Sequence, residues 1–375
     1  MNLKSFKLDT LASTVVNHSL YVQKGSRILI DVTGNVGSFT DVLIEKVQSA
    51  GGIPFLRTLS SNHVRSIIKH CTQEQMNLWL RQELYRIKSM DGYIGVRADS
   101  NSHDSSDISE AQYNKFLNYF LNPYQKHVSS LKNWVLMFFP TSGSAQAAQM
   151  SLDRLTNIYF KSCNVNYNEL KKRTEPLQER LTHTNIVRIT GLNTDLNFSI
   201  QNMPSMICAG QHNLPDGEIF TCPQIDSIEG NIRFNVKVNY MGIELEDVEL
   251  MFKSGRIVKA NCNKPEVLHN ILSTDQGASR IGEFGIGLNP YIQQSFNNML
   301  FDEKMSGSIH LGLGQAYPMV DNGNRSSVHW DLTLSQFPEH GGGNLYFDDV
   351  LIRRNGLFVK EDLIPLNYFG RVEKN

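Results

Sequence analysis

The first part of the chain alternates between short apolar runs and stretches in which apolar residues have helical spacing. The apolar runs predict strands, which lie at positions 27–32, 53–56, 93–96 and 134–139. Between the first two runs, apolar residues have helical spacing at Phe39, Val42, Leu43 and Val47, and this helix ends at a pair of glycines. Strands that are apolar on both faces and are separated by helices indicate a parallel sheet covered on both sides.

The pattern changes after the charged stretch 168–180, which predicts a surface helix. Short strands are expected at 186–189 and 196–200, and two hairpins follow further along the chain. The turn of the first hairpin is Lys253-Ser254-Gly255, and that of the second is Asn355-Gly356, a dipeptide typical of tight β-hairpins. We therefore expect an α/β protein with two domains. Residues 1–190 would form a parallel-sheet α/β domain, and residues 191–375 an α+β domain rich in antiparallel strands.

Composition limits the possible functions. Of the 375 residues 40% are apolar, and 36 Lys and Arg balance 37 Asp and Glu. A nucleic-acid-binding protein would more often carry a basic excess, so we expect no nucleic-acid partner. No apolar run reaches the roughly 18 residues that span a membrane, and positions 1–10 lack an apolar signal core. We therefore expect a cytoplasmic protein with no membrane partner.

The five cysteines are spread along the chain, and no CxxC pair occurs. Their odd number and wide spacing argue against a disulfide framework and against a cysteine-rich zinc site. We interpret them as small apolar side chains in the core.

Carboxylates and imidazoles in apolar or glycine-rich settings mark the second half of the chain. Glu218 follows a turn and opens a strand, whereas Glu283 lies between glycines. His310 lies in a stretch of apolar residues and glycines. His329 and Asp331 are two residues apart, so in a strand both side chains would point to the same face. Imidazole and carboxylate are the ligands that zinc, cobalt and manganese hydrolases use.

Each of these residues also has a purely structural explanation. A buried glutamate can pair with an arginine, and a lone histidine is usually a satisfied core residue. Together, however, two Glu, two His and one Asp form a donor set for two metal ions. An unpaired charge in an apolar setting would be costly, and no comparable set of basic residues lies beside them. The set as a whole therefore predicts a metal site.

Around these residues the sequence resembles the aminopeptidase T/S family of metallo-aminopeptidases, also called the thermophilic aminopeptidases. The resemblance covers most of the chain and is densest between Thr194 and Asp331. The stretches that carry it are, in chain order, Thr194-Asp195-Leu196, Asn213-Leu214-Pro215-Asp216-Gly217-Glu218-Ile219-Phe220, Asp275-Gln276-Gly277-Ala278, Ile281-Gly282-Glu283, Phe301-Asp302-Glu303-Lys304, Gly307-Ser308-Ile309-His310-Leu311-Gly312-Leu313-Gly314, Tyr317 and His329-Trp330-Asp331.

The resemblance implies that residues 191–375 hold two divalent metal ions, zinc, cobalt or manganese, and carry out catalysis. Matched residue by residue, the metal ligands would be Glu218, Glu283, His310, His329 and Asp331. The resemblance also implies a homodimer whose active sites face an enclosed space, and peptide substrates with a free N-terminus. Residues 1–190 would then serve as a scaffold that provides dimer contacts and controls access.

The reaction implied by the resemblance is hydrolysis of the N-terminal residue of a peptide by a water molecule that two metal ions activate. Tyr317 would be the catalytic tyrosine and would donate a hydrogen bond to the oxyanion, or else it orients a ligand. The proton acceptor would be a ligand glutamate such as Glu283, or Glu303. Glu303 could instead pair with Lys304.

Two other classes of protein fit part of the pattern. His310, His329 and Asp331 form the two-histidine, one-carboxylate set of non-haem iron oxygenases. Ring-cleaving dioxygenases of similar fold would use one iron and would not need Glu218 or Glu283. The other alternative is a non-enzymatic binding protein on the same fold, against which the complete ligand set argues.

Overall fold

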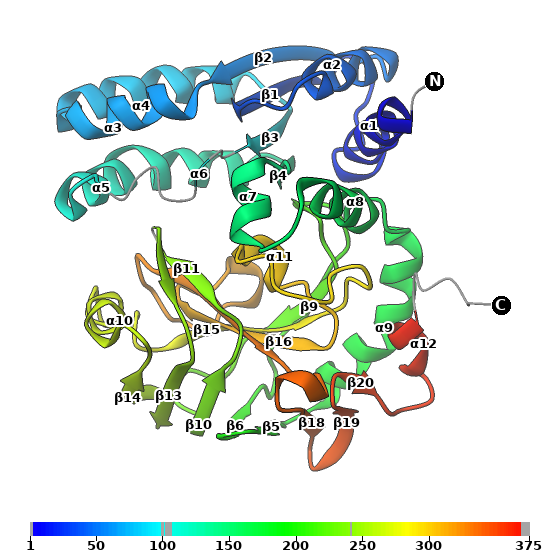
Figure 1. The fold of residues 1–375 in the computed structure, drawn as a ribbon, viewed down its shortest axis with the longest axis vertical. Helices are drawn as coiled ribbons and strands as arrows, with labels where there is room; N and C mark the ends of the chain where they lie inside the picture. The colour runs from blue at the N-terminus through cyan, green and yellow to red at the C-terminus, as the bar shows by residue number, and fades with distance from the viewer. Residues whose placement is uncertain (1–2, 99–100, 102–106, 241, 369–375) are drawn as a thin grey trace. The chain divides into compact units, whose positions relative to one another are not determined.

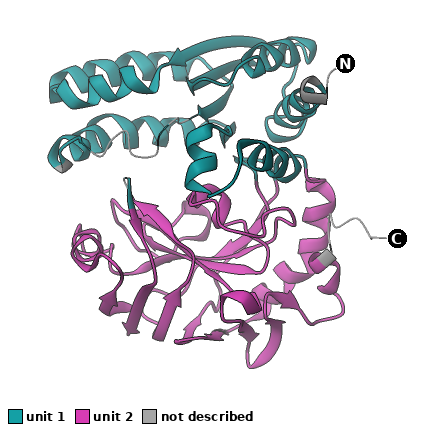
Figure 2. Cartoon of the chain, in the orientation of Figure 1, with its two compact units in different colours: residues 1–164, 210–215, 241–243 teal, residues 165–209, 216–240, 244–375 magenta. Residues whose placement is uncertain are grey.

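The computed structural model describes residues 3–98, 101, 107–240 and 242–368 (Figure 1). The sequence also predicts a long polar segment at 99–110 between the third and fourth strands, and most of this segment lies outside the described residues. Two compact units make up the chain (Figure 2). The first comprises residues 1–164, 210–215 and 241–243, and the second comprises residues 165–209, 216–240 and 244–375.

The first unit is built on a parallel sheet, as the apolar runs predict. Its strand order is β2-β1-β3-β4-β8, and every neighbouring pair is parallel. The central strands are buried on both faces, which explains why their sequences are apolar throughout. The sequence did not predict β8, a two-residue strand that comes from a much later part of the chain. The strands are β1 (Arg27–Gly34), β2 (Ile53–Leu59), β3 (Gly92–Ala98), β4 (Asn133–Phe138) and β8 (Asn213–Leu214).

Helices connect the strands of this sheet and bury their apolar stripes against it. One core cluster joins Leu29 of β1 to Ile87, Tyr93 and Val128. The longest helix of this unit begins at a capping box in which Thr72 and Gln75 satisfy each other's backbone N–H groups. The helices are α1 (Leu3–Ser13), η1 (Thr14–Ser19), α2 (Phe39–Ser49), α3 (Ser61–His70), α4 (Gln73–Lys88), α5 (Glu110–Phe116), η2 (Leu117–Leu121), α6 (Asn122–Ser129), α7 (Ser142–Ala147) and α8 (Leu152–Cys163).

The second unit contains an eight-stranded sheet of order β14-β13-β10-β6-β5-β18-β19-β20, in which all neighbours are antiparallel. Both predicted hairpins are confirmed, and Asn355 and Gly356 have the positive φ angles that a tight turn requires. The strands are β5 (Ile186–Gly191), β6 (Thr194–Ser199), β10 (Glu229–Phe234), β13 (Val248–Lys253), β14 (Arg256–Asn261), β18 (Gly343–Phe347), β19 (Val350–Arg354) and β20 (Leu357–Phe358).

A second antiparallel sheet of this unit has the order β17-β16-β15-β9-β7. Every residue of β15 and β16 is buried, so both faces of these two central strands are covered. Its strands are β7 (Met206–Cys208), β9 (Glu218–Thr221), β15 (Ile281–Gly287), β16 (Ser308–Gly314) and β17 (His329–Ser335). The other elements are α9 (Tyr167–His183), β11 (Val238–Tyr240), β12 (Ile243–Leu245), α10 (Pro265–Leu272), α11 (Met299–Asp302), η3 (Pro318–Val320), η4 (Pro338–His340) and α12 (Ile364–Tyr368).

The main change of unit falls between Asn164 and Val165, whereas the sequence pattern suggests a boundary near residue 190. Helix α9 accounts for much of the difference. It is charged on its solvent face, but Leu170, Leu177 and Leu181 bury an apolar stripe within the second unit. Strand β5 follows α9 and pairs with β6 and β18, so it also belongs to the second unit.

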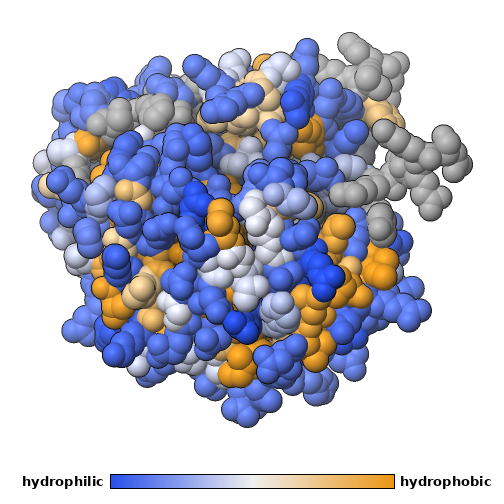
Figure 3. Space-filling view, turned by 60° about the horizontal axis from the view of Figure 1, so that its bottom comes forward, coloured by the Kyte–Doolittle hydropathy of each residue, from blue (hydrophilic) through white to orange (hydrophobic). Residues whose placement is uncertain are grey.

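None of the helices in the described part of the chain combines the length and apolar content that a membrane crossing requires. Figure 3 shows one face of the molecule, on which hydrophobic side chains stand in small groups between hydrophilic ones. Scattered apolar residues of this kind are usual on protein surfaces and need no special role.

Candidate metal centre

Four neighbouring strands of the buried sheet bring the predicted donors to one face. Glu283 of β15 lies opposite Gly312 of β16, which in turn lies opposite Asp331 of β17. His310 and His329 are each two residues from these positions, and alternate residues of a strand share a face. Glu218 opens β9, which pairs with the other edge of β15. Antiparallel pairing therefore gathers five residues that are far apart in the sequence.

Glycines at two positions of this face leave space for the donors. A Cβ atom at Gly312 would lie 2.8 Å from Asp331 Oδ1 and 2.9 Å from Glu283 Cβ. A Cβ atom at Gly285 would overlap the ring of His310. Since any side chain at these positions would displace a donor, the glycine-rich sequence of β15 and β16 is explained by the crowding of this face.

The five residues form two groups of three donors. In each group the donor atoms lie within 4.8 Å of one another, and Glu283 belongs to both. In the first group, His310 Nε2 lies 3.4 Å from Glu283 Oε1 and 3.5 Å from Glu218 Oε2. In the second group, His329 Nε2 lies 3.6 Å from Glu283 Oε2 and 3.4 Å from Asp331 Oδ2. The arrangement suits two cations that share one carboxylate.

Several polar atoms of these residues are buried and have no hydrogen-bond partner. They are Glu218 Oε2, Glu283 Oε2, His310 Nδ1, His329 Nε2 and Asp331 Oδ1. A buried carboxylate or imidazole without a partner is costly, and native proteins normally satisfy such groups. Three of these atoms are carboxylate oxygens, which a cation would satisfy.

The electrostatics of the centre also favour positive charge. Burial alone would lower the pKa of both imidazoles, but the surrounding carboxylates raise the pKa of His310 to about 9 and that of His329 to about 10. Burial also raises the pKa of Asp331, yet His329 and His310 bring that pKa far below its ordinary value. Burial raises the pKa of Glu283, because the charged carboxylate is cut off from water.

The orientation of His329 is fixed by a contact outside the donor groups. Its Nδ1 lies 2.8 Å from the backbone carbonyl oxygen of Gln315. This contact requires a proton on Nδ1, so the neutral form of His329 directs the lone pair of Nε2 at Glu283 and Asp331. Metal-binding histidines are commonly held in this way. The residues therefore fit a pair of divalent cations with oxygen and nitrogen ligands, such as zinc, cobalt or manganese.

Glu303 lies beside the centre but belongs to neither donor group. Its Oε1 accepts a hydrogen bond from Lys304, so the predicted alternative of a Glu303–Lys304 pair is present in the structure. Burial raises the pKa of Glu303 to about 8, although the Lys304 ammonium opposes the shift. Lys304 is fully buried, and its Nζ also lies 3.1 Å from Glu218 Oε1. Burial alone would lower the pKa of Lys304, but Glu218 and Glu303 raise it well above its ordinary value.

Tyr317 lies at the border of the centre. Its ring centroid is 4.6 Å from that of His329 and 5.8 Å from that of Phe220. The residue is 41% exposed, in contrast to the buried carboxylates beside it. Tyr317 can therefore contact both a donor residue and a molecule that arrives from solvent.

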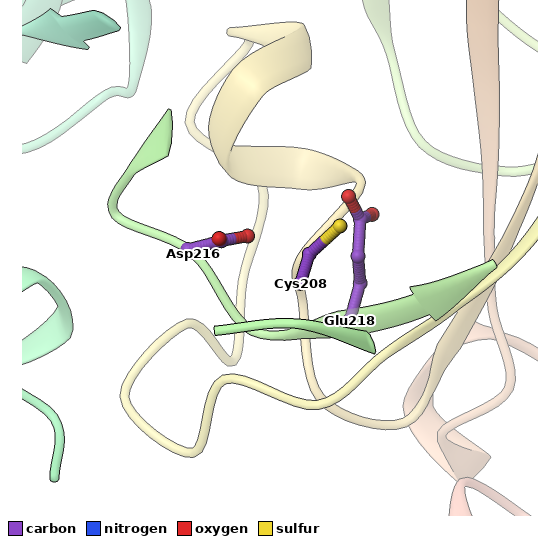
Figure 4. Close-up of side chains that lie close together, drawn as sticks. All are labelled: Cys208, Asp216 and Glu218. Carbon is purple, nitrogen blue, oxygen red and sulfur yellow. The ribbon is translucent and has the colours of Figure 1, made fainter. Parts of the chain in front are cut away.

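The structure also places residues near the centre that the sequence analysis did not assign to it. Cys208, Asp216 and Glu218 form a third group of donors within 4.8 Å of one another. Figure 4 shows the thiol of Cys208 and the carboxylate of Asp216 close to the end of the Glu218 side chain. Cys208 lies opposite Glu218 in the β7–β9 pairing, a contact that no sequence spacing indicates. Asp216 and Lys304 do stand in the stretches that carry the family resemblance.

Comparison with known proteins places the chain among the metal-dependent proteases. A model of the thermophilic metalloprotease (M29) family matches residues 4–341, and the chain belongs to this family. It is 26% identical over 375 residues to aminopeptidase AmpS of Bacillus subtilis (strain 168), a match that covers 88% of this chain and 90% of that protein. It is 24% identical over 418 residues to aminopeptidase PepS of Streptococcus thermophilus, covering 96% of this chain and all of that protein.

A solved structure, wild-type AmpT from Thermus thermophilus, has the same fold. The TM-score is 0.80 at 20% sequence identity, and the match covers 95% of this chain and 100% of that one. The predicted fold class, an α/β protein with one parallel sheet and further antiparallel sheets, is confirmed.

Proposed function

We propose that this protein is an aminopeptidase that uses two divalent metal ions to remove N-terminal residues from peptides. The sharing of Glu283 between the two donor groups carries the proposal, because one carboxylate between two cation positions is the arrangement of a two-metal hydrolase. Glu218, Glu283 and His310 would hold one ion, and Glu283, His329 and Asp331 the other. The family membership and the names of the relatives support peptide bonds as the substrate.

The protein side chains prepare the site for this reaction. When bound, the two ions supply an activated water and polarise the scissile carbonyl. Glu283 or Glu303 accepts the proton of the attacking water at a carboxylate oxygen. Both are buried, so the accepted proton stays shielded from bulk solvent. The Gln315 carbonyl keeps His329 in the tautomer that presents Nε2 to the site.

Tyr317 stabilises the oxyanion that forms on the substrate. Its hydroxyl is a neutral donor at pH 7, and its ring is held against His329. Tyr317→Phe keeps the ring and removes only the hydroxyl. We expect kcat to fall by about 100-fold or more while the metal content is unchanged. Tyr346→Phe in β18 is the control, and a kcat near wild type in Tyr317→Phe would assign Tyr317 to ligand orientation instead.

The function is tested with aminoacyl-p-nitroanilides and with short peptides in the presence of Co²⁺, Zn²⁺ or Mn²⁺. We expect release from substrates with a free amine and none from the same substrates with an acetylated N-terminus. Elemental analysis should find about two divalent ions per chain. A folded protein that releases nothing with any of these metals, or that holds a single iron, would contradict the proposal. The second of these results would point to the dioxygenase class.

A further inference from the structure

A third group of potential metal ligands lies directly beside the two proposed metal positions. Cys208, Asp216 and Glu218 have donor atoms within 4.8 Å of one another, and Glu218 also belongs to the first donor group. Asp216 and Glu218 are both buried. A thiol with two carboxylates is a donor set that zinc, cobalt or cadmium would accept. The structure therefore raises the question of what neutralises this group.

The ammonium group of Lys304 contacts this group through Glu218. Lys304 is 0% exposed, and its Nζ pairs with Glu218 Oε1 at 3.1 Å and with Glu303 Oε1. One buried ammonium thus pairs both with a member of the third group, Glu218, and with Glu303.

We propose that the Lys304 ammonium acts as a built-in cation that fills the third position and so limits the centre to two metal ions. The inference rests on the proposed two-metal function. The geometry supports it, because Lys304 Nζ lies 3.1 Å from Glu218 Oε1, and Glu218 belongs to both the first and the third donor group.

Lys304 also acts on the geometry of Glu218. The ammonium occupies Oε1 of this carboxylate, while Oε2 faces His310 Nε2 at 3.5 Å and has no hydrogen-bond partner. Lys304 therefore directs a single oxygen of Glu218 toward the first metal position. A third cation in place of the ammonium would compete for the same carboxylate.

The test replaces the ammonium with an uncharged chain of similar length in the full-length protein. In Lys304→Met we expect metal analysis to find about three ions per chain in place of about two. With Co²⁺, the third ion should give a thiolate-to-cobalt charge-transfer absorption in the near ultraviolet. That absorption should disappear in the double variant with Cys208→Ser. Lys304→Arg keeps the charge and should keep two ions, as should Arg353→Met, which removes a buried cation that bonds to Gln336.

A second measurement does not depend on the folding of Lys304→Met. Cys208→Ser in the presence of Lys304 should bind as many ions as wild type, because the ammonium already fills the third position. Fewer ions in Cys208→Ser than in wild type would overturn the inference, as would two or fewer ions in folded Lys304→Met. Either result leaves the proposed function standing if wild type releases N-terminal residues. A wild-type protein without metal or activity would instead refute the function.

Discussion

Each unit of this protein buries a cluster of charges, but the two clusters differ in how far the chain itself supplies partners for the buried carboxylates. In the first unit, Asp31 of β1 is fully buried and accepts hydrogen bonds from Arg57 at 2.8 Å, Tyr93 at 2.7 Å and Arg97 at 3.1 Å. Arg57 in turn pairs with Glu83 at 3.1 Å. In the second unit, Glu218, Glu283 and Asp331 each retain a buried oxygen without a hydrogen-bond partner.

The difference separates a charge cluster that the chain neutralises itself from one that keeps unpartnered buried carboxylate oxygens. Around Asp31 the opposite charges are supplied by the chain itself, so the cluster is complete when the protein folds. At the centre of the second unit negative charge is in excess, and among the described residues Lys304 and the two histidines are the groups paired with these carboxylates. The first cluster should therefore respond to mutation as a stability element, whereas the second should respond through metal binding and activity.

The largest effect on stability is expected from Asp31→Asn. The substitution removes the carboxylate that pairs with the buried Arg57 and the partly buried Arg97, which costs about 3–5 kcal/mol of unfolding free energy. Urea unfolding measures the loss, and hydrogen exchange should locate it in β1, β2 and β3. Asp91→Asn breaks the exposed pair with Arg27 and is the matched control, with a much smaller effect. Equal losses of unfolding free energy in the two variants would show that the Asp31 cluster is no more important for stability than an exposed ion pair.

Glu283→Gln should lower activity and metal binding without lowering the stability of the metal-free protein, the opposite of what we expect for Asp31→Asn. Because Glu283 belongs to both donor groups, we expect kcat/KM to fall by more than about 100-fold and both metal ions to bind more weakly. The metal-free variant should unfold at the same temperature as metal-free wild type or higher, since one of several crowded negative charges is gone. Glu339→Gln on the surface is the control. A destabilised but active Glu283→Gln would show that Glu283 is a structural residue.

Metal addition should stabilise the second cluster alone. A divalent ion at roughly ten times its dissociation constant adds about 1.4 kcal/mol to the unfolding free energy through binding to the native state. We expect Co²⁺ or Zn²⁺ to raise the thermal midpoint of wild type and a chelator to reverse the change. The midpoint of Glu283→Gln should respond little, whereas Asp31→Asn should respond as wild type does. Equal responses of Glu283→Gln and wild type would place the stabilising ions elsewhere.

The smallest effect is the acid dependence of the Asp31 cluster. Burial alone would raise the pKa of Asp31, but Arg97 and Arg57 bring it below its ordinary value. A folded-state pKa below the unfolded one gives stability that is fully present above the unfolded pKa of about 3.9. That stability is lost as the pH falls through the folded-state pKa. Unfolding free energies measured below about pH 4 should therefore fall more steeply with acid in wild type than in Asp31→Asn.

Local patterns in the sequence were sufficient to predict most of the fold. The apolar runs of β1 and β3 are buried on both faces of a parallel sheet, whereas β2 lies at its edge and is largely exposed. Each turn of the two predicted hairpins contains a glycine with a positive φ angle. Strand β8 could not be predicted, because two residues carry no periodic signal and their partner β4 is distant in the sequence. The charged residues of helix α9 predict a surface helix, and only the packing of its apolar stripe assigns the helix to the second unit.

The candidate site was predicted only in part. The sequence named Glu218, Glu283, His310, His329 and Asp331 as a donor set, and the structure brings them within a few ångströms, while metal binding itself stays a prediction. Lys304 appeared in the sequence only as a neighbour of Glu303. Its contact with Glu218 joins residues from different elements, so no spacing along the chain reveals it.

The sequence by itself determined which chemical groups are available: carboxylates, imidazoles, a tyrosine and the glycines that leave room for them. Tertiary structure decided which of these groups meet and which charges remain uncompensated. The physical reason is the register of an antiparallel sheet, which aligns Glu283, Gly312 and Asp331 across three strands. A shift by one residue would turn each donor to the opposite face of the sheet, and the composition of the chain would be unchanged.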